Sequence, residues 1–163
     1  MKIPITITEQ EFKDIIKGTK KLKLKAAFML GFYQAMRVSE VINLEKEDVN
    51  TLTGFIHIKQ SKGKKDRMIP LMPELKYYVR YLPINISRQG LWKSIRTKAK
   101  KILGKDIHFH SLRHSGASFY LNDREIDLKF IQDFLGHSRI QTTEIYTHVN
   151  PTQLKKAFEN AKT

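Results

Sequence analysis

Residues 135–149 read LGHSRIQTTEIYTHV, and this segment places His137 nine positions before Tyr146. Two further segments carry charged and titratable side chains: HSLRH at 110–114 and RVSE at 37–40. Arginine stays charged and donates two parallel hydrogen bonds to a phosphate, and a tyrosine hydroxyl can act as a nucleophile. The three segments together therefore hold the residue types that are needed to attack a phosphodiester with a protein side chain.

The net charge points to a polyanionic partner. Thirty Lys and Arg residues stand against sixteen Asp and Glu residues, which gives +14 at pH 7. Such an excess repels itself in a compact chain and favours binding to a phosphate backbone, so we expect double-stranded DNA as the partner. A generally lysine-rich proteome would explain the charge alone. A membrane surface is disfavoured because the basic residues fall on several elements instead of one amphipathic helix.

Length and composition indicate one compact domain. The chain has 163 residues, 40% of them hydrophobic, and no cysteine, which excludes disulfides and thiolate metal sites. The first residues do not form a signal peptide, and no apolar run approaches the length of a membrane span. We expect a cytoplasmic protein.

The N-terminal part predicts two helices and a functional turn. Thr8 and Glu11 form a capping-box pattern for a helix that ends at Gly18. The next helix runs to about Ala35 and is apolar nearly all round, so we expect it at the centre of the fold.

Arg37 follows in the turn, before a helix for which Ser39 is the expected N-cap. An arginine at the end of a buried helix requires an anion. That anion is either a phosphate or the Glu40 carboxylate one turn away, and these residues alone favour neither.

Residues 54–59 and 66–71 alternate between apolar and polar side chains, which predicts a β-hairpin with a tip at 61–65. We interpret the tip as a finger that reaches DNA phosphates, although basic hairpin tips are usually only solvated. The expected DNA contacts here are Lys59, Lys62, Lys64, Lys65 and Arg67.

Residues 73–81 predict a short helix, and residues 89–103 predict a longer one between the cap Ser87 and Gly104. The longer helix has one apolar side and one basic side without an acidic residue. It is typical of a helix that lies along DNA, with a solvated face as the alternative. Its expected DNA contacts are Lys93, Arg96 and Lys100.

The C-terminal half predicts four more helices. Residues 110–122 form the first, with His110 and Arg113 on one face at its N-terminal end. Residues 128–135 follow, and a short helix that carries Tyr146 begins after Ser138. The last helix, 152–161, has a thin apolar stripe that suits docking on its own chain or on a neighbour. The predicted fold is α+β, mainly helical, with one small antiparallel sheet.

These residues support a metal-free phosphoryl transfer. Arg37 and Arg113 would clamp the phosphate, and Tyr146 would attack it. His110 or His137 would accept the tyrosine proton or hold the phosphate, and a lysine at the hairpin tip, Lys62, would protonate the leaving 5′ oxygen. No carboxylate pair suits Mg²⁺ and no histidine spacing suits zinc, so we expect neither metal nor cofactor.

The motifs resemble those of the tyrosine recombinase family, or phage integrases, and most closely the Xer-type enzymes. AMRVSE at 35–40 resembles the first arginine box and KGKKDR at 62–67 the hairpin with the catalytic lysine. HSLRH resembles the His-x-x-Arg box, and LGH supplies the third-box histidine. The resemblance assigns Glu40 to an acidic position that supports the arginines. It gives the catalytic set Arg37, Lys62, His110, Arg113, His137 and Tyr146.

The resemblance implies a catalytic-domain fold over residues 1–163 and a 3′-phosphotyrosyl intermediate. It also implies a tetramer on two duplexes in which the last helix packs into a neighbouring subunit. Family members carry an N-terminal core-binding domain, which we expect to be absent from this chain. Two other hypotheses remain open at this point: a DNA-binding protein without turnover, and relaxation of supercoils as in type IB topoisomerases.

Overall fold

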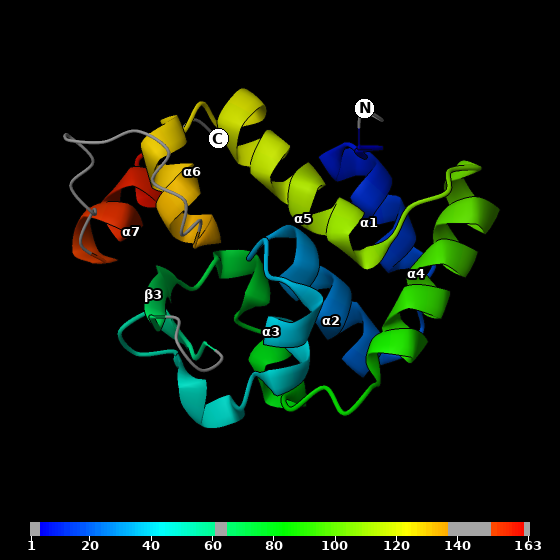
Figure 1. Cartoon of the computed structure of the whole chain (residues 1–163), viewed down its shortest axis with the longest axis horizontal. Helices are drawn as coiled ribbons and strands as arrows, with labels where there is room; N and C mark the ends of the chain where they lie inside the picture. The colour runs from blue at the N-terminus through cyan, green and yellow to red at the C-terminus, as the bar shows by residue number, and fades with distance from the viewer. Residues whose placement is uncertain (1–3, 61–64, 137–150, 162–163) are drawn as a thin grey trace.

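The computed structural model describes residues 4–60, 65–136 and 151–161 of the chain. Figure 1 shows helices around α2, with a small sheet at one side and α6 and α7 beside it. The elements are α1 Glu9–Lys17, α2 Leu22–Phe32, α3 Val38–Asn43, η1 Lys46–Asp48, β1 Val49–Asn50, β2 Phe55–Ile58, β3 Arg67–Pro70, η2 Pro73–Leu75, η3 Tyr78–Tyr81, α4 Arg88–Leu103, α5 Phe109–Ser118, η4 Phe119–Asp123, α6 Leu128–Leu135 and α7 Pro151–Glu159.

Helix α2 is the centre of the fold, as its sequence predicts. Every residue from 26 to 32 is buried, and the helix packs against α1, α3, α4, α5 and the 3₁₀ turns η2 and η3. It ends at Phe32, three residues earlier than expected. Ala35 then adopts a left-handed φ of 48°, which turns the chain sharply before α3.

Close contact with α2 fixes the position of α5. A Cβ atom built on Gly116 would lie 1.9 Å from the carbonyl oxygen of Phe32, so the two backbones touch at this point. Only glycine permits this approach. The Tyr120 hydroxyl, one turn further on, donates a 2.6 Å hydrogen bond to the Tyr33 carbonyl and holds the same two segments together.

The sheet has three antiparallel strands in the order β1-β2-β3. The predicted hairpin is confirmed as β2 and β3, with Ile58 opposite Arg67 and Ile56 opposite Ile69. Strand β1 pairs through Val49 and Asn50 alone, and two residues are too few for sequence alternation to predict. Residues 73–81 form two 3₁₀ turns instead of the predicted helix.

The predicted caps are confirmed on two helices. Thr8 and Glu11 form the capping box of α1, and the Ser87 hydroxyl accepts from the Gly90 N–H at the start of α4. Asp127 caps α6. Helices α4 and α6 both end at glycines with left-handed φ, namely Gly104 at 69° and Gly136 at 70°. The predicted helix 110–122 is α5, continued as the π-helical turn η4.

Helix α7 docks on its own chain. Leu154 is buried, and the Phe158 ring lies 5.0 Å from that of Tyr120 and 4.7 Å from that of Phe134. The structure therefore shows the intramolecular one of the two predicted docking modes. Among the described residues, no helix has both the length and the apolar character to cross a membrane.

Candidate active site

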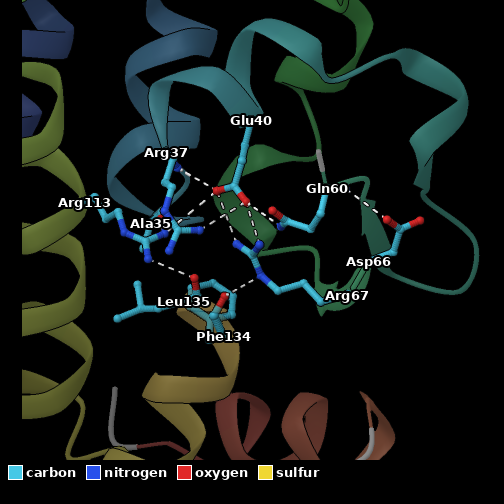
Figure 2. Close-up of polar contacts among 9 residues, drawn as sticks. All are labelled: Ala35, Arg37, Glu40, Gln60, Asp66, Arg67, Arg113, Phe134 and Leu135. Atoms are coloured by element: carbon cyan, nitrogen blue, oxygen red, sulfur yellow. Dashed lines mark hydrogen bonds and ion pairs between the residues drawn. The ribbon is translucent and has the colours of Figure 1, made fainter. Parts of the chain in front are cut away.

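The Glu40 carboxylate is the centre of a polar cluster that joins α3, the hairpin and α5 (Figure 2). Its side chain is 5% exposed. Arg67 donates to it twice, at 2.5 Å and 3.3 Å, and Gln60 donates through Nε2 at 3.0 Å. The backbone N–H of Arg37 donates to Oε1 at 2.8 Å, which ties the carboxylate to the start of its own helix.

Arg113 is the buried arginine of the cluster. Its guanidinium donates to the carbonyl oxygens of Ala35 and Leu135, both at 2.8 Å, and its Nη1 lies 3.9 Å from Glu40 Oε1. These two carbonyls belong to the turn before Arg37 and to the C-terminal end of α6. Arg113 therefore fixes two motif segments that are about a hundred residues apart in the sequence.

Arg37 is the accessible arginine. It is the N-cap residue of α3, and its side chain is 36% exposed with Nη1 3.7 Å from Glu40 Oε2. The prediction that Ser39 caps this helix is wrong, because the helix begins at Val38. The ion pair with Glu40 exists, yet it is long and leaves one side of the guanidinium open to a second anion.

The position of Arg67 differs from the expected one, because the sequence predicts that this residue contacts DNA from the hairpin finger. Its side chain is 12% exposed and lies inside the cluster, where Nε also donates to the Phe134 carbonyl at 3.3 Å. Gly136 packs directly on it: a Cβ atom there would fall 2.8 Å from Cδ, Nε and Cζ of Arg67. The donors of Arg67 thus serve the polar cluster.

The charges of the cluster do not cancel. Three guanidinium groups, those of Arg37, Arg67 and Arg113, surround one carboxylate. Burial disfavours the Glu40 charge, but the hydrogen bonds and charge of Arg67, together with the hydrogen bonds from the Arg37 N–H and Gln60, outweigh it and lower the pKa of Glu40. Burial and the nearby charge of Arg37 lower the pKa of Arg113 to about 10, so this residue remains protonated at neutral pH. The cluster therefore keeps an excess of positive charge that favours an anion.

His110 lies in the first turn of α5, one turn before Arg113, and is exposed. Its ring meets the edge of His114 with centroids 4.5 Å apart. Burial of part of the ring lowers its pKa, and the positive charges of His114, Arg113 and Arg37 lower it further. At neutral pH the imidazole is uncharged and able to accept a proton.

The remaining predicted catalytic residues, Lys62, His137 and Tyr146, lie outside the described residues, and so does Lys64. Their roles stay predictions. Among residues 4–60, 65–136 and 151–161 there is no group of three or more His, Cys, Asp or Glu side chains arranged to hold a metal ion.

The predicted DNA contacts lie in different environments. Lys65, Lys93 and Lys100 are exposed, whereas Lys59 pairs with Asp48 at 3.1 Å. Arg96 stacks on Trp92, 4.6 Å from the ring centre, and donates twice to Asp106. The basic side of α4 is thus partly neutralised by an acid from the loop after it. A hollow of about 390 Å³ opens along this side between Trp92, Arg96 and Asp106.

Sequence reasoning missed Gln60, the carbonyls of Ala35, Phe134 and Leu135, and the inward position of Arg67. The inward position of Arg67 is predictable from the alternation of apolar and polar residues in the hairpin. Arg67 is two residues from the buried Ile69 and pairs with the buried Ile58, so it shares their face of the sheet. Backbone carbonyls carry no sequence signal, and only the folded chain brings them to Arg113.

Comparison with known proteins identifies the family of the chain. The sequence model of the phage integrase family matches residues 6–153 of the chain. The chain belongs to this family. The segments that contain Arg37, Glu40 and Arg113 thus meet in one cluster of a phage integrase fold.

Named relatives agree with this assignment. Tyrosine recombinase XerA of Pyrococcus horikoshii is 34% identical over 179 residues, which cover 98% of this chain and 62% of the relative. Tyrosine recombinase XerD of Staphylococcus saprophyticus is 38% identical over 146 residues, covering 76% and 49%. The chain therefore spans about half to two thirds of the length of these relatives.

Solved structures share the fold. The crystal structure of XerA recombinase aligns with a TM-score of 0.74 at 28% identity, over 98% of this chain and 65% of that one. XerH site-specific recombinase bound to its difH substrate aligns with a TM-score of 0.69 at 22% identity, over 98% and 55%. The phage integrase fold thus extends over nearly the whole chain.

Proposed function

We propose that this chain is the catalytic domain of a site-specific DNA recombinase that cuts and rejoins strands through a covalent 3′-phosphotyrosyl intermediate on Tyr146. The observation that carries the proposal is the Glu40 cluster. It brings Arg37 and Arg113, which are far apart in sequence, to one carboxylate, and it leaves Arg37 accessible and the cluster positively charged. A phosphodiester is the anion that family membership and the net charge of +14 both favour.

The proposed chemistry uses preorganised charge. Arg113 is held by two carbonyls and cannot move away when negative charge develops on the non-bridging oxygens, and Arg37 binds the same phosphate from the open side. His110, uncharged at neutral pH, accepts the Tyr146 proton or holds the phosphate by a hydrogen bond. The predicted roles of Lys62 and His137 complete the site: Lys62 protonates the 5′ oxygen that leaves.

The proposed partner is double-stranded DNA, bound by several subunits. XerH was solved with its difH substrate, and a lambda integrase structure of the same fold, with a TM-score of 0.63, is a tetramer on a Holliday junction. We extend both properties to this protein as proposals, together with exchange of α7 between subunits, a single catalytic domain over residues 1–163 and a cytoplasmic location. Exchange would require α7 to leave the aromatic contacts of Phe158.

A covalent adduct assay tests the activity. Wild type and Tyr146→Phe are incubated with a library of nicked duplexes of randomised sequence, and protein–DNA adducts that survive denaturation are separated and sequenced. We expect adducts with wild type alone, enriched in one sequence. Salt-sensitive DNA binding with no adduct from wild type would indicate a binding protein without turnover. Plasmid relaxation without sequence enrichment would indicate a topoisomerase.

A further inference from the structure

Glu40 is shared unequally among the three arginines around it. Arg67 reaches the carboxylate at 2.5 Å and 3.3 Å, as hydrogen bonds, whereas the closest ion-pair distances are 3.7 Å for Arg37 and 3.9 Å for Arg113. Figure 2 shows the Arg67 guanidinium facing both carboxylate oxygens from the hairpin side. The carboxylate is therefore engaged mainly by an arginine that does not face outward.

This distribution has an electrostatic consequence. A buried carboxylate with a free lone pair binds the nearest guanidinium strongly, because water does not compete with it. Without Arg67, Glu40 would be free to form a short pair with Arg37 or Arg113. Such a pair would neutralise a charge that an incoming phosphate needs, so the identity of the partner of Glu40 sets the anion affinity of the site.

We propose that Arg67 is a positioning residue that occupies Glu40 and thereby keeps Arg37 and Arg113 available to an anionic phosphodiester. The inference rests on the proposed function, since it assigns Arg37 and Arg113 to a phosphate. It assigns Arg67 a different role from the predicted DNA contact.

Two further contacts place Arg67 in this role. Its Nε donates to the Phe134 carbonyl, and Gly136 lies on its guanidinium too closely for any side chain. The group is therefore locked in orientation between β3 and the C-terminal end of α6, and Arg113 holds the neighbouring Leu135 carbonyl. A fixed fork directs both Arg67 hydrogen bonds to Glu40, which a lysine at the same place could not do.

The test titrates inorganic phosphate while the Nε–Hε signals of Arg37 and Arg113 are followed by NMR. We expect Arg67→Met to weaken phosphate binding about tenfold, the effect of one lost charge interaction of moderate strength. The double variant Arg67→Met/Glu40→Gln should bind phosphate to within about threefold of wild type, because it lacks the carboxylate that would pair with Arg37 or Arg113. Arg67→Lys should bind phosphate more weakly than wild type despite its equal charge.

Two control variants distinguish a positioning role of Arg67 from a general effect of net charge on phosphate binding. Arg67→Met/Glu47→Gln has the same formal charge as the recovering double variant but keeps Glu40, since Glu47 is an exposed residue of η1. It should remain as weak as Arg67→Met. Arg80→Met removes an exposed arginine of η3 and should bind phosphate like wild type.

The proposal is overturned if Arg67→Met/Glu40→Gln binds no better than Arg67→Met, or if the Glu47 control recovers equally. Should Arg67→Met fail to fold, the double variant is compared with Glu40→Gln, and a difference of more than about tenfold contradicts the proposal. Phosphate binding requires no Tyr146 chemistry. A wild type that shows this pattern but forms no DNA adduct therefore contradicts the proposed function alone.

Discussion

The backbone of Gly136 packs against the guanidinium group of Arg67. A Cβ atom added to this glycine would fall 2.8 Å from Arg67 Cζ. The contact joins the end of α6 to the strand that follows the hairpin tip. The glycine also has a left-handed φ of 70°, so two independent constraints disfavour a side chain at this position.

Gly136→Ala is therefore expected to lose about 3 kcal/mol of unfolding free energy, of which about 1–2 kcal/mol is left-handed strain and the rest is overpacking. Gly104→Ala is the matched control, because Gly104 has φ 69° with no atom within 4 Å of its added Cβ. The Gly104→Ala variant should lose only the part of the unfolding free energy that is due to left-handed strain. Urea unfolding measures both, and equal losses would contradict the importance of the Arg67 contact.

Glu40→Gln should reduce stability by about 3 kcal/mol at pH 7, because it breaks a buried ion pair. The folded state lowers the pKa of Glu40 below its usual value near 4.5. A lowered carboxyl pKa stabilises the fold above the unfolded pKa, and that contribution is lost as the pH falls through the folded value. The stability difference between wild type and Glu40→Gln should hold steady above about pH 5 and shrink below about pH 4.5. Urea titrations across this range check it, and a difference that is constant down to pH 3 would refute it.

Gly116→Ala should separate α5 from α2, because the added Cβ would lie 1.9 Å from the Phe32 carbonyl oxygen. A helical glycine-to-alanine change normally gains up to about 1 kcal/mol, so a net loss of about 2 kcal/mol would report the backbone contact. Gly90→Ala, in the first turn of α4 where the added Cβ meets only side chains, serves as the control. Because Arg113 lies on α5 one turn before Gly116, adduct formation should fall with Gly116→Ala and stay unchanged with Gly90→Ala.

If His110 accepts the Tyr146 proton, cleavage requires the uncharged imidazole and its rate should fall as the pH drops through the pKa of His110. That pKa is lowered by partial burial and then by the charge of His114 and the two arginines. His114→Gln removes one of these charges, so the acid limb of the rate profile should move to higher pH. His57→Gln, at the exposed ion pair with Asp66, should leave it in place. NMR titration of His110 gives the same comparison without catalysis.

The helices were predictable because their signals are local. Thr8, Ser87 and Asp127 mark helix starts, and Gly104 and Gly136 mark ends that need a left-handed φ. The capping of α3 was not predictable, since Ser39 fits the local pattern and the tertiary contact of Glu40 with the Arg37 N–H overrides it.

The site was predictable in its residue types and not in its connections. Arg37, Glu40, His110 and Arg113 follow from motif chemistry. Arg67 is the main arginine partner of the Glu40 carboxylate. This pairing depends on a strand register and on a helix end that meet only after folding. Their meeting point is set by packing across the whole domain, which no local pattern encodes.

Helix α4 has one buried side and one exposed side. Leu91, Ile95 and Ala99 are buried and anchor the helix, while Trp92, Lys93 and Lys100 are exposed. Substitutions at the exposed positions consequently leave the anchoring residues and the Glu40 cluster untouched. The surface charge of this helix can therefore be varied separately from the packing that stabilises the fold.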